Sequence, residues 1–251
     1  MSDDQPITVT IEKNVRRITF DRPDKANALS LGLARSFLAE VRAAVADETC
    51  EVVVISGNGR FLSAGGDLTE TMAAAEAGPF IDELAATMHT ALLELRASRL
   101  VSIVAVSGIA AGAGAGIAFS ADITICAESA VFVPAYLAAG LSPDCGVSYF
   151  LTRSAGRQRA VQYLLEGAKL SAGRALDWGL VSHVVPDAEF AGALEDLVTS
   201  VSTKSLQSWA TVKALLRDDD LAAHLDEERQ GIAAMVGHPV TAAALLAFTS
   251  R

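Results

Sequence analysis

The chain has 251 residues, of which 51% are hydrophobic and 20% charged, a composition that excludes a disordered polypeptide and allows a substantial core. Its formal net charge is −10, and its lysines and arginines form no basic run, so nucleic acid is not a predicted partner. The three cysteines, Cys50, Cys126 and Cys145, lie far apart without CxxC spacing. They indicate a reducing, cytoplasmic setting and no metal site or disulfide framework. We assign surface or structural roles to the four histidines, including His89.

Hydrophobic periodicity predicts an α/β chain. The first part contains a hairpin at Ile7–Ile11 and Val15–Phe20, a helix capped by Ser30 and a buried strand at Glu51–Ser56. A glycine-containing loop at Gly57–Asp67 and a long helix at Phe80–Ser98 follow. The later part contains two strands at Ile123–Ala127 and Ala130–Val133 and a loop at Tyr136–Cys145. Three helices follow, at Val147–Ser154, at Arg157–Glu166 and after Ser171, and then a last strand at Val181–Val185. From Ala188 the pattern is helical, interrupted mainly at Pro239. We therefore divide the chain into a core of strand–strand–helix units, residues 1–190, and a helical appendage, residues 191–251.

Between these parts lies an uncharged stretch, Val101–Ala121, that is long enough for a membrane span. It contains four glycines and three serines and has no aromatic belt, so a buried strand and helix are favoured and no membrane is a predicted partner. We expect a strand over Val101–Val106, a turn over Ser107–Gly116 and a helix over Ile117–Ala121. The unpaired N–H groups at the start of such a helix suit a negatively charged oxygen.

Two glycine-rich loops each follow a buried strand and open a helix: SAGGD at Ser63–Asp67 and GAGAG at Gly112–Gly116. Neither fits the GxGxxG fingerprint of dinucleotide sites or the GxxxxGK[ST] pattern of P-loops. Their small residues let a backbone approach a ligand closely. The alternative is that they only permit tight packing between strand and helix.

Five blocks of sequence resemble the crotonase (enoyl-CoA hydratase/isomerase) superfamily, in the order of that family: DRPDKANALS, RFLSAGGDL, VSIVAVSGIAAGAGAGIAFSADITICAESAVF, GLSPDCGVSYFLTRSAGRQRA and LSAGRALDWGLV. The resemblance implies a crotonase-like spiral of ββα units, with C-terminal helices that form a homotrimer or a dimer of trimers. It also implies an acyl-CoA thioester as substrate, no cofactor beyond that coenzyme A, and a place in fatty acid metabolism.

Carried over by position, the oxyanion hole of the family falls on the backbone N–H groups of Gly66 and Ala113, which would stabilise a thioester enolate. The resemblance also marks a set of residues that contact the substrate or its coenzyme A: Lys25, Ala26, Ala28, Ala64, Gly66, Asp67, Leu68, Ala113 and Tyr136. Lys213 and Arg251 are candidates for contacts with the coenzyme A phosphates.

The chain departs from the hydratases of this superfamily at both of their acids, because the two glutamate positions fall on Gly116 and Tyr136. Asp144, in LSPDCG, instead occupies a position where some members carry an acid, namely Δ3-Δ2-enoyl-CoA isomerases and proteins similar to 1,2-epoxyphenylacetyl-CoA isomerase. One carboxylate suffices to take a proton from C2 and return it at C4. The sequence therefore predicts an acyl-CoA isomerase that shifts a double bond, with Asp144, Gly66 and Ala113 as its catalytic groups.

Alternatives remain open at this point. Asp144 is also a candidate N-cap, bonded to the N–H groups near Gly146 and Val147. Tyr136 is interpreted as filling space, and Asp67 as fixing its loop or capping a helix. For the whole chain, the alternatives to an isomerase are a catalytically inactive acyl-CoA-binding homologue and an atypical enoyl-CoA hydratase.

Overall fold

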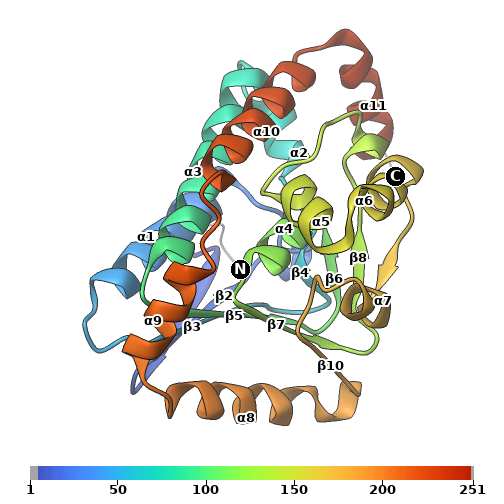
Figure 1. Ribbon diagram of the computed structural model, residues 1–251. Helices are drawn as coiled ribbons and strands as arrows, with labels where there is room; N and C mark the ends of the chain where they lie inside the picture. The colour runs from blue at the N-terminus through green and yellow to red at the C-terminus, as the bar shows by residue number, and fades with distance from the viewer. Residues whose placement is uncertain (1–4, 250–251) are drawn as a thin grey trace.

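The computed structural model describes residues 5–249 and contains two sheets covered by helices (Figure 1). The larger sheet has six strands in the order β1-β2-β3-β5-β7-β10, at Ile7–Glu12, Val15–Phe20, Val52–Gly57, Val101–Val106, Ile123–Ala127 and His183–Val185. The smaller sheet has four in the order β4-β6-β8-β9, at Phe61–Ser63, Ile109–Ala111, Val131–Val133 and Leu170–Ser171. Only the β1–β2 and β8–β9 pairs of these sheets are antiparallel.

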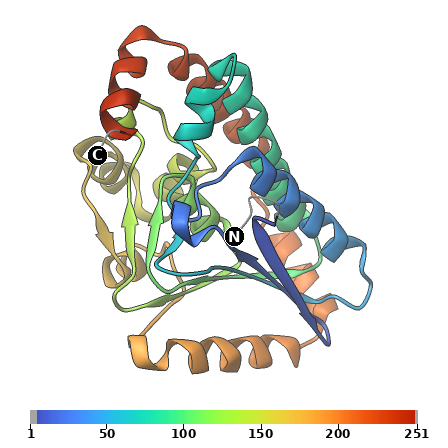
Figure 2. The same ribbon diagram turned by 180° about the vertical axis from the view of Figure 1, so that it is seen from behind.

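Eleven α-helices lie among the described residues, at Leu31–Ala46 (α1), Leu68–Ala73 (α2), Ala77–Ala97 (α3), Ala113–Ser120 (α4), Val147–Ala155 (α5), Arg157–Glu166 (α6), Ala172–Asp177 (α7), Phe190–Ser202 (α8), Leu206–Leu215 (α9), Leu221–Val236 (α10) and Pro239–Thr249 (α11). Helices α1, α3 and α10 pack side by side on one side of the molecule, and α8 runs across the outer face of the larger sheet (Figures 1 and 2). None of the described helices combines the length and the apolar character that a membrane crossing requires.

The central strands β3 and β5 of the larger sheet are buried on both faces, which explains their nearly continuous apolar runs. In β3, Val53 and Ile55 belong to the main core beneath α1 and α3, whereas Val52 and Val54 face the other way, in a second core with Val198 of α8. The strand register agrees with this division, because Val54 pairs with Ile103 of β5 and both belong to the second core. A strand buried on both faces has no polar side to alternate with.

The chain winds through three successive ββα units. In each unit one strand joins the larger sheet and the next strand joins the smaller one: β3 with β4, β5 with β6, and β7 with β8. A helix follows each pair: α2, α4 and α5. Of these, α4 packs on strands of both sheets, and α5 packs on α4. This repeated crossing between two sheets is the predicted spiral, and the α/β prediction is confirmed.

The sequence misplaced two short strands of this spiral. The segment Gly57–Asp67 was expected to be a loop and Ser107–Gly116 a turn, yet they contain β4 and β6, and α4 begins at Ala113 instead of Ile117. Both strands have three residues, too few for alternation to show. Helix α4 lies against β4 because Gly114 has no side chain: a Cβ there would lie 2.6 Å from the carbonyl oxygen of Ser63.

The predicted helical region after Ala188 consists of four helices, with breaks near Thr203 and Leu216 in addition to the one before Pro239. Pro239 begins α11, a position where the missing N–H of proline leaves no intrahelical bond unmade. Helix α10 also packs against α3, which carries residues of the cavity described below.

We expect Gly114→Ala to lower the free energy of unfolding by about 1–3 kcal/mol, because the new methyl group overlaps the backbone of Ser63. The matched control is Gly192→Ala in α8, where a methyl group meets no described atom within 4 Å, and which should be neutral or stabilising by up to about 1 kcal/mol. Urea denaturation measures both. Equal effects of the two substitutions would contradict the packing described for α4.

Candidate active site

A cavity of about 760 Å³ lies where the loops after β4 and β6 end. It brings together most of the residues predicted to bind substrate: Lys25, Ala28, Ala64, Gly66, Asp67, Leu68, Ala113, Tyr136 and Asp144. Ala26 is not part of the cavity lining; its carbonyl accepts the N–H of Ala64 at 3.0 Å and so joins two loops of the wall. Apolar side chains complete the wall: Ile81, Leu84, Met88, Leu141 and Ile232.

The two loops predicted to form an oxyanion hole touch each other. A Cβ on Gly65 would lie 3.2 Å from the carbonyl oxygen of Ala111 and 3.5 Å from the nitrogen of Ala113, and positive φ at Gly65 (93°) and Gly112 (51°) permits this approach. Ala113 is the first residue of α4, so its N–H has no intrahelical acceptor. Neither that N–H nor the N–H of Gly66 bonds another described residue. Two residues with unpaired backbone donors thus line one cavity.

A buried ion pair holds the first of these loops in place. The guanidinium of Arg22 donates from both terminal nitrogens to Oδ2 of Asp67 at 3.1 Å. Oδ1 of Asp67 caps α2 by accepting the N–H of Glu70 at 3.1 Å, and the N–H of Asp67 donates to Leu29 at 3.0 Å. Asp67 therefore fixes the loop and caps the helix, as one of the sequence alternatives held, and its carboxylate is fully engaged in these bonds.

Gly116 explains why the site has no first hydratase acid. A Cβ at this position would lie 2.3 Å from the carbonyl oxygen of Cys145 and 2.9 Å from its Cβ. The backbone at Cys145 therefore fills the space that any side chain on Gly116 would need. The same contact seats the neighbouring residue, Asp144, directly above α4.

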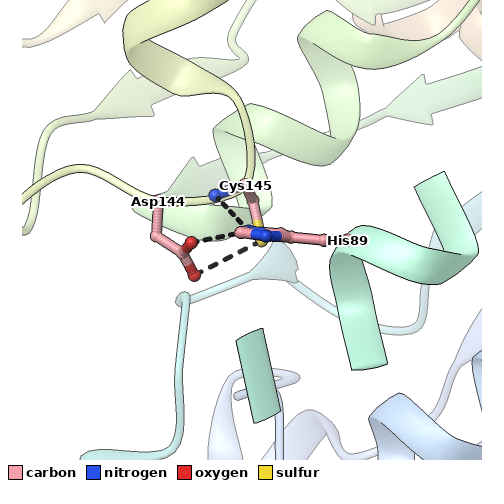
Figure 3. A group of neighbouring side chains, drawn as sticks. All are labelled: His89, Asp144 and Cys145. Carbon is pink, nitrogen blue, oxygen red and sulfur yellow. Dashed lines mark hydrogen bonds and ion pairs between the residues drawn. The ribbon is translucent and has the colours of Figure 1, made fainter. Parts of the chain in front are cut away.

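The carboxylate of Asp144 is buried in the cavity wall, 6% exposed, and faces His89 of α3 (Figure 3). Its Oδ1 lies 2.7 Å from Nε2 of His89, and its Oδ2 accepts a weak bond from the thiol of Cys145 at 3.7 Å. The backbone carbonyl of Asp144 accepts the hydroxyl of Tyr136 at 2.8 Å. Tyr136 thus does more than fill space: it anchors the turn that carries the acid, and burial raises the pKa of its phenol well above the ordinary value.

The N-cap interpretation of Asp144 is wrong, because a different carboxylate takes that role. Glu228, on α10, accepts the N–H groups of Gly146 at 2.6 Å and Ser148 at 3.1 Å, together with the Ser148 hydroxyl at 2.5 Å. Burial raises the pKa of the Glu228 carboxyl, while these hydrogen bonds oppose that rise. Asp144 is therefore relieved of capping, and its side chain is available to a ligand in the cavity.

His89, for which the sequence predicted a surface or structural role, does not lie at the surface and contacts Asp144 in the cavity wall. It is 5% exposed, and its spacing from Ala85 and Leu92 on α3 places it on the buried face, which is the signal that could have found it. The N–H of Cys145 also lies 3.3 Å from Nε2. Nε2 of His89 and Oδ1 of Asp144 form one hydrogen bond, and which of them donates depends on the tautomer of the imidazole.

Of the two cations predicted to reach coenzyme A phosphates, Lys213 lies away from the cavity lining. Lys213 is half-buried, lies 2.9 Å from Oδ2 of Asp122 and donates to the carbonyl of Leu100 at 2.6 Å. Burial lowers the pKa of its ammonium group, and the Asp122 carboxylate opposes that change. Arg251 lies outside the described residues.

Among the described residues, one cluster has the donor atoms and spacing of a metal site: His89, Asp144 and Cys145, whose ligand atoms all lie within 4.8 Å of one another. The sequence predicted no metal site, because the cluster joins segments that are far apart in the chain. Burial raises the pKa of the Cys145 thiol well above its ordinary value.

Comparison with known proteins agrees with this geometry. Residues 10–245 match the sequence model of the enoyl-CoA hydratase/isomerase family, and the chain belongs to that family, within the crotonase superfamily of enzymes. It is 29% identical over 255 residues to 4-chlorobenzoyl coenzyme A dehalogenase-2 of Arthrobacter sp, covering 100% of this chain and 92% of the relative. It is 33% identical over 227 residues to 1,2-epoxyphenylacetyl-CoA isomerase of Escherichia coli K12, covering 87% and 86%.

A solved structure gives the same fold. The crystal structure of an enoyl-CoA hydratase from Mycobacterium avium subsp. paratuberculosis K-10 superposes with a TM-score of 0.90 at 28% identity, over 98% of this chain and 96% of that one. These relatives span dehalogenation, isomerisation and hydration. The fold and family are thus shown, while the reaction has to be argued from the site.

We expect Glu228→Ala to lower the free energy of unfolding by about 1–3 kcal/mol, because it leaves the N–H groups of Gly146 and Ser148 buried without an acceptor. Glu227→Ala, one position earlier on the exposed side of α10, is the matched control and should change stability by less than about 0.5 kcal/mol. Thermal or urea unfolding measures both. Indistinguishable stabilities would contradict the capping role of Glu228.

Proposed function

We propose that the protein is an acyl-CoA isomerase that moves a double bond from the 3 to the 2 position of an enoyl-CoA, with Asp144 as its only acid–base group. One observation carries the proposal. Asp144 presents a buried carboxylate to the cavity and does not cap a helix, and the packing at Gly116 leaves no room for an acidic side chain at that position. A ring-derived acyl-CoA is a close variant, since the same proton movement applies to it.

The reaction follows from these groups. Asp144 removes a proton from C2, and the electron pair moves into the thioester carbonyl to give a dienolate. The N–H groups of Gly66 and Ala113 would hold the negative oxygen, and each such donor is typically worth on the order of 3 kcal/mol of transition-state stabilisation. The same carboxyl group then returns the proton at C4. The exchange is redox-neutral, so the coenzyme A of the substrate is the only coenzyme that it needs.

His89 supports this proton transfer as a positioning residue. Its bond to Oδ1 fixes the plane of the Asp144 carboxylate, and Oδ2 keeps only the weak contact with the Cys145 thiol. Oδ2 is therefore the oxygen that we assign to the substrate protons. A group that packing and hydrogen bonds hold in one orientation is already positioned for proton transfer.

The walls support the proposed substrate class. Lys25 and the backbone of the Ala64–Leu68 segment lie at one part of the cavity, where we place coenzyme A. Leu84, Met88, Leu141 and Ile232 line an apolar part suited to a hydrocarbon acyl group. A role in fatty acid metabolism in the cytoplasm is in keeping with such a substrate.

Self-association through the C-terminal helices is part of the same proposal. Leu215 and Leu216, at the end of α9, are 80% and 71% exposed, and Val240 on α11 is 71% exposed. Contact between subunits would cover apolar side chains of this kind. A homotrimer or a dimer of trimers is the assembly that we propose.

Asp144→Asn should lower kcat for conversion of a 3-enoyl-CoA to the 2-enoyl-CoA by about 10²–10⁴-fold, because the amide cannot accept the C2 proton. The absorbance of the conjugated product follows the reaction. Asp177→Asn, at the exposed end of α7, is the control and should keep the wild-type rate. If Asp144→Asn turned over as fast as wild type, the single-acid mechanism would be lost. If the wild-type protein gave no product but acyl-CoA raised its Tm, the inactive binding protein would be favoured.

The Asp144–His89 pair favours a second candidate, the hydrolytic dehalogenation named for the Arthrobacter relatives. Here the carboxylate adds to the ring carbon that bears chlorine, chloride leaves, and an aryl ester of Asp144 forms. His89 then takes a proton from water, which cleaves the ester to a phenol and restores the carboxylate. One water is consumed, and one chloride and one proton are released.

The two candidates separate on 4-chlorobenzoyl-CoA. The isomerase proposal predicts that no chloride is released and that His89→Gln slows isomerisation without trapping any intermediate. Dehalogenation predicts chloride release by the wild type, and in His89→Gln an aryl group bound covalently to Asp144, detected as an added mass. That covalent adduct would overturn the isomerase assignment.

A further inference from the structure

The cluster of His89, Asp144 and Cys145 has the composition of a zinc site. Imidazole nitrogen, carboxylate oxygen and thiolate sulfur are the three ligand types that Zn²⁺ takes in proteins. Nε2 and Oδ1 are 2.7 Å apart and Sγ and Oδ2 are 3.7 Å apart, and the cluster joins helix α3 to the turn before α5 (Figure 3). These three side chains converge on one point instead of pointing apart.

The spacing is close to what a bound ion requires. With Zn–N and Zn–O bonds of about 2.0–2.2 Å and Zn–S of about 2.3 Å, tetrahedral ligands lie roughly 3.3–3.7 Å apart. Separation of His89 from Asp144 by about half an ångström would open the centre. Asp144 and Cys145 both line the cavity, so an ion can enter from it and keep its fourth position toward it.

The charges around the cluster favour a cation. Asp144 and Glu228 are both buried carboxylates that influence each other, and among the described residues neither forms an ion pair with a lysine or arginine. A Zn²⁺ ion bound by Asp144 and by the Cys145 thiolate gives a neutral unit, with the thiol proton released to solvent. Such a unit removes the cost of an uncompensated buried carboxylate.

We propose that His89, Asp144 and Cys145 form a Zn²⁺-binding site in the cavity wall, and that the bound ion inhibits the enzyme. The ion withdraws negative charge from the Asp144 carboxylate, which the proposed isomerisation uses as its base, and it takes up the imidazole that orients this carboxylate. The inhibition rests on the proposed function, whereas the binding does not.

Cobalt binding tests the site itself. Co²⁺ substitutes for Zn²⁺ and gives a near-ultraviolet charge-transfer band when a thiolate is a ligand. We expect one Co²⁺ per chain with such a band, displaced by Zn²⁺ and absent from Cys145→Ser and Cys145→Ala, with His89→Gln weakening Co²⁺ binding by about tenfold or more. Cys50→Ser alters a buried cysteine outside the cluster and should keep the band. Absence of the band in wild type, or its persistence in both Cys145 variants with native circular dichroism, would overturn the site.

Activity tests the inhibition separately. Zn²⁺ should abolish 3-enoyl-CoA isomerisation, EDTA should restore it, and the Zn²⁺ concentration for half-inhibition should rise by about tenfold or more in Cys145→Ser. Full turnover with the ion bound, as the Co²⁺ band reports, would overturn the inhibition and the role of Asp144 while leaving the site in place. If no isomerase activity exists, the proposed function fails and the Co²⁺ titration alone decides the site.

Discussion

The contact between Gly116 and the backbone of Cys145 is the constraint on which the rest of the site depends. Because residue 116 has no side chain, the turn before α5 descends onto α4 until a Cβ there would lie 2.3 Å from the Cys145 carbonyl oxygen. The contact removes the space for one acid and brings another, Asp144, to the cavity wall beside His89. The packing at Gly116 thus excludes an acidic side chain at this position and places Asp144 at the cavity.

The N-terminal ends of α4 and α5 have different roles around this contact. The start of α4 leaves the N–H of Ala113 unpaired at the cavity lining, where we propose that it holds a developing negative oxygen. The start of α5 is instead occupied by Glu228 from the C-terminal helices. If Asp144 capped α5, its carboxylate would be bonded to backbone N–H groups and could not accept a substrate proton. The C-terminal region therefore contributes to the site through Glu228 and through Ile232, which lines the cavity.

Local patterns predicted much of this protein. The hairpin, the buried strands and the Ser30 cap follow from periodicity and capping chemistry. The resemblance to the crotonase superfamily, not a local pattern, pointed to Gly66 and Ala113, which do lie together at one cavity. What failed depends on contacts between distant segments. His89 is 55 residues from Asp144, and Glu228 is 82 from Gly146, so neither partnership leaves a trace in local sequence. Strands β4 and β6 were missed for a related reason, since three residues carry too little pattern.

The proposed isomerisation depends on one buried carboxylate that takes a proton from C2 and returns it at C4. A 3-enoyl-CoA deuterated at C2 tests this directly, with mass spectrometry or NMR of the product. A single carboxyl shielded from water predicts that part of the deuterium appears at C4. Product that carries only solvent hydrogen at C4, at every stage of turnover, would contradict the account.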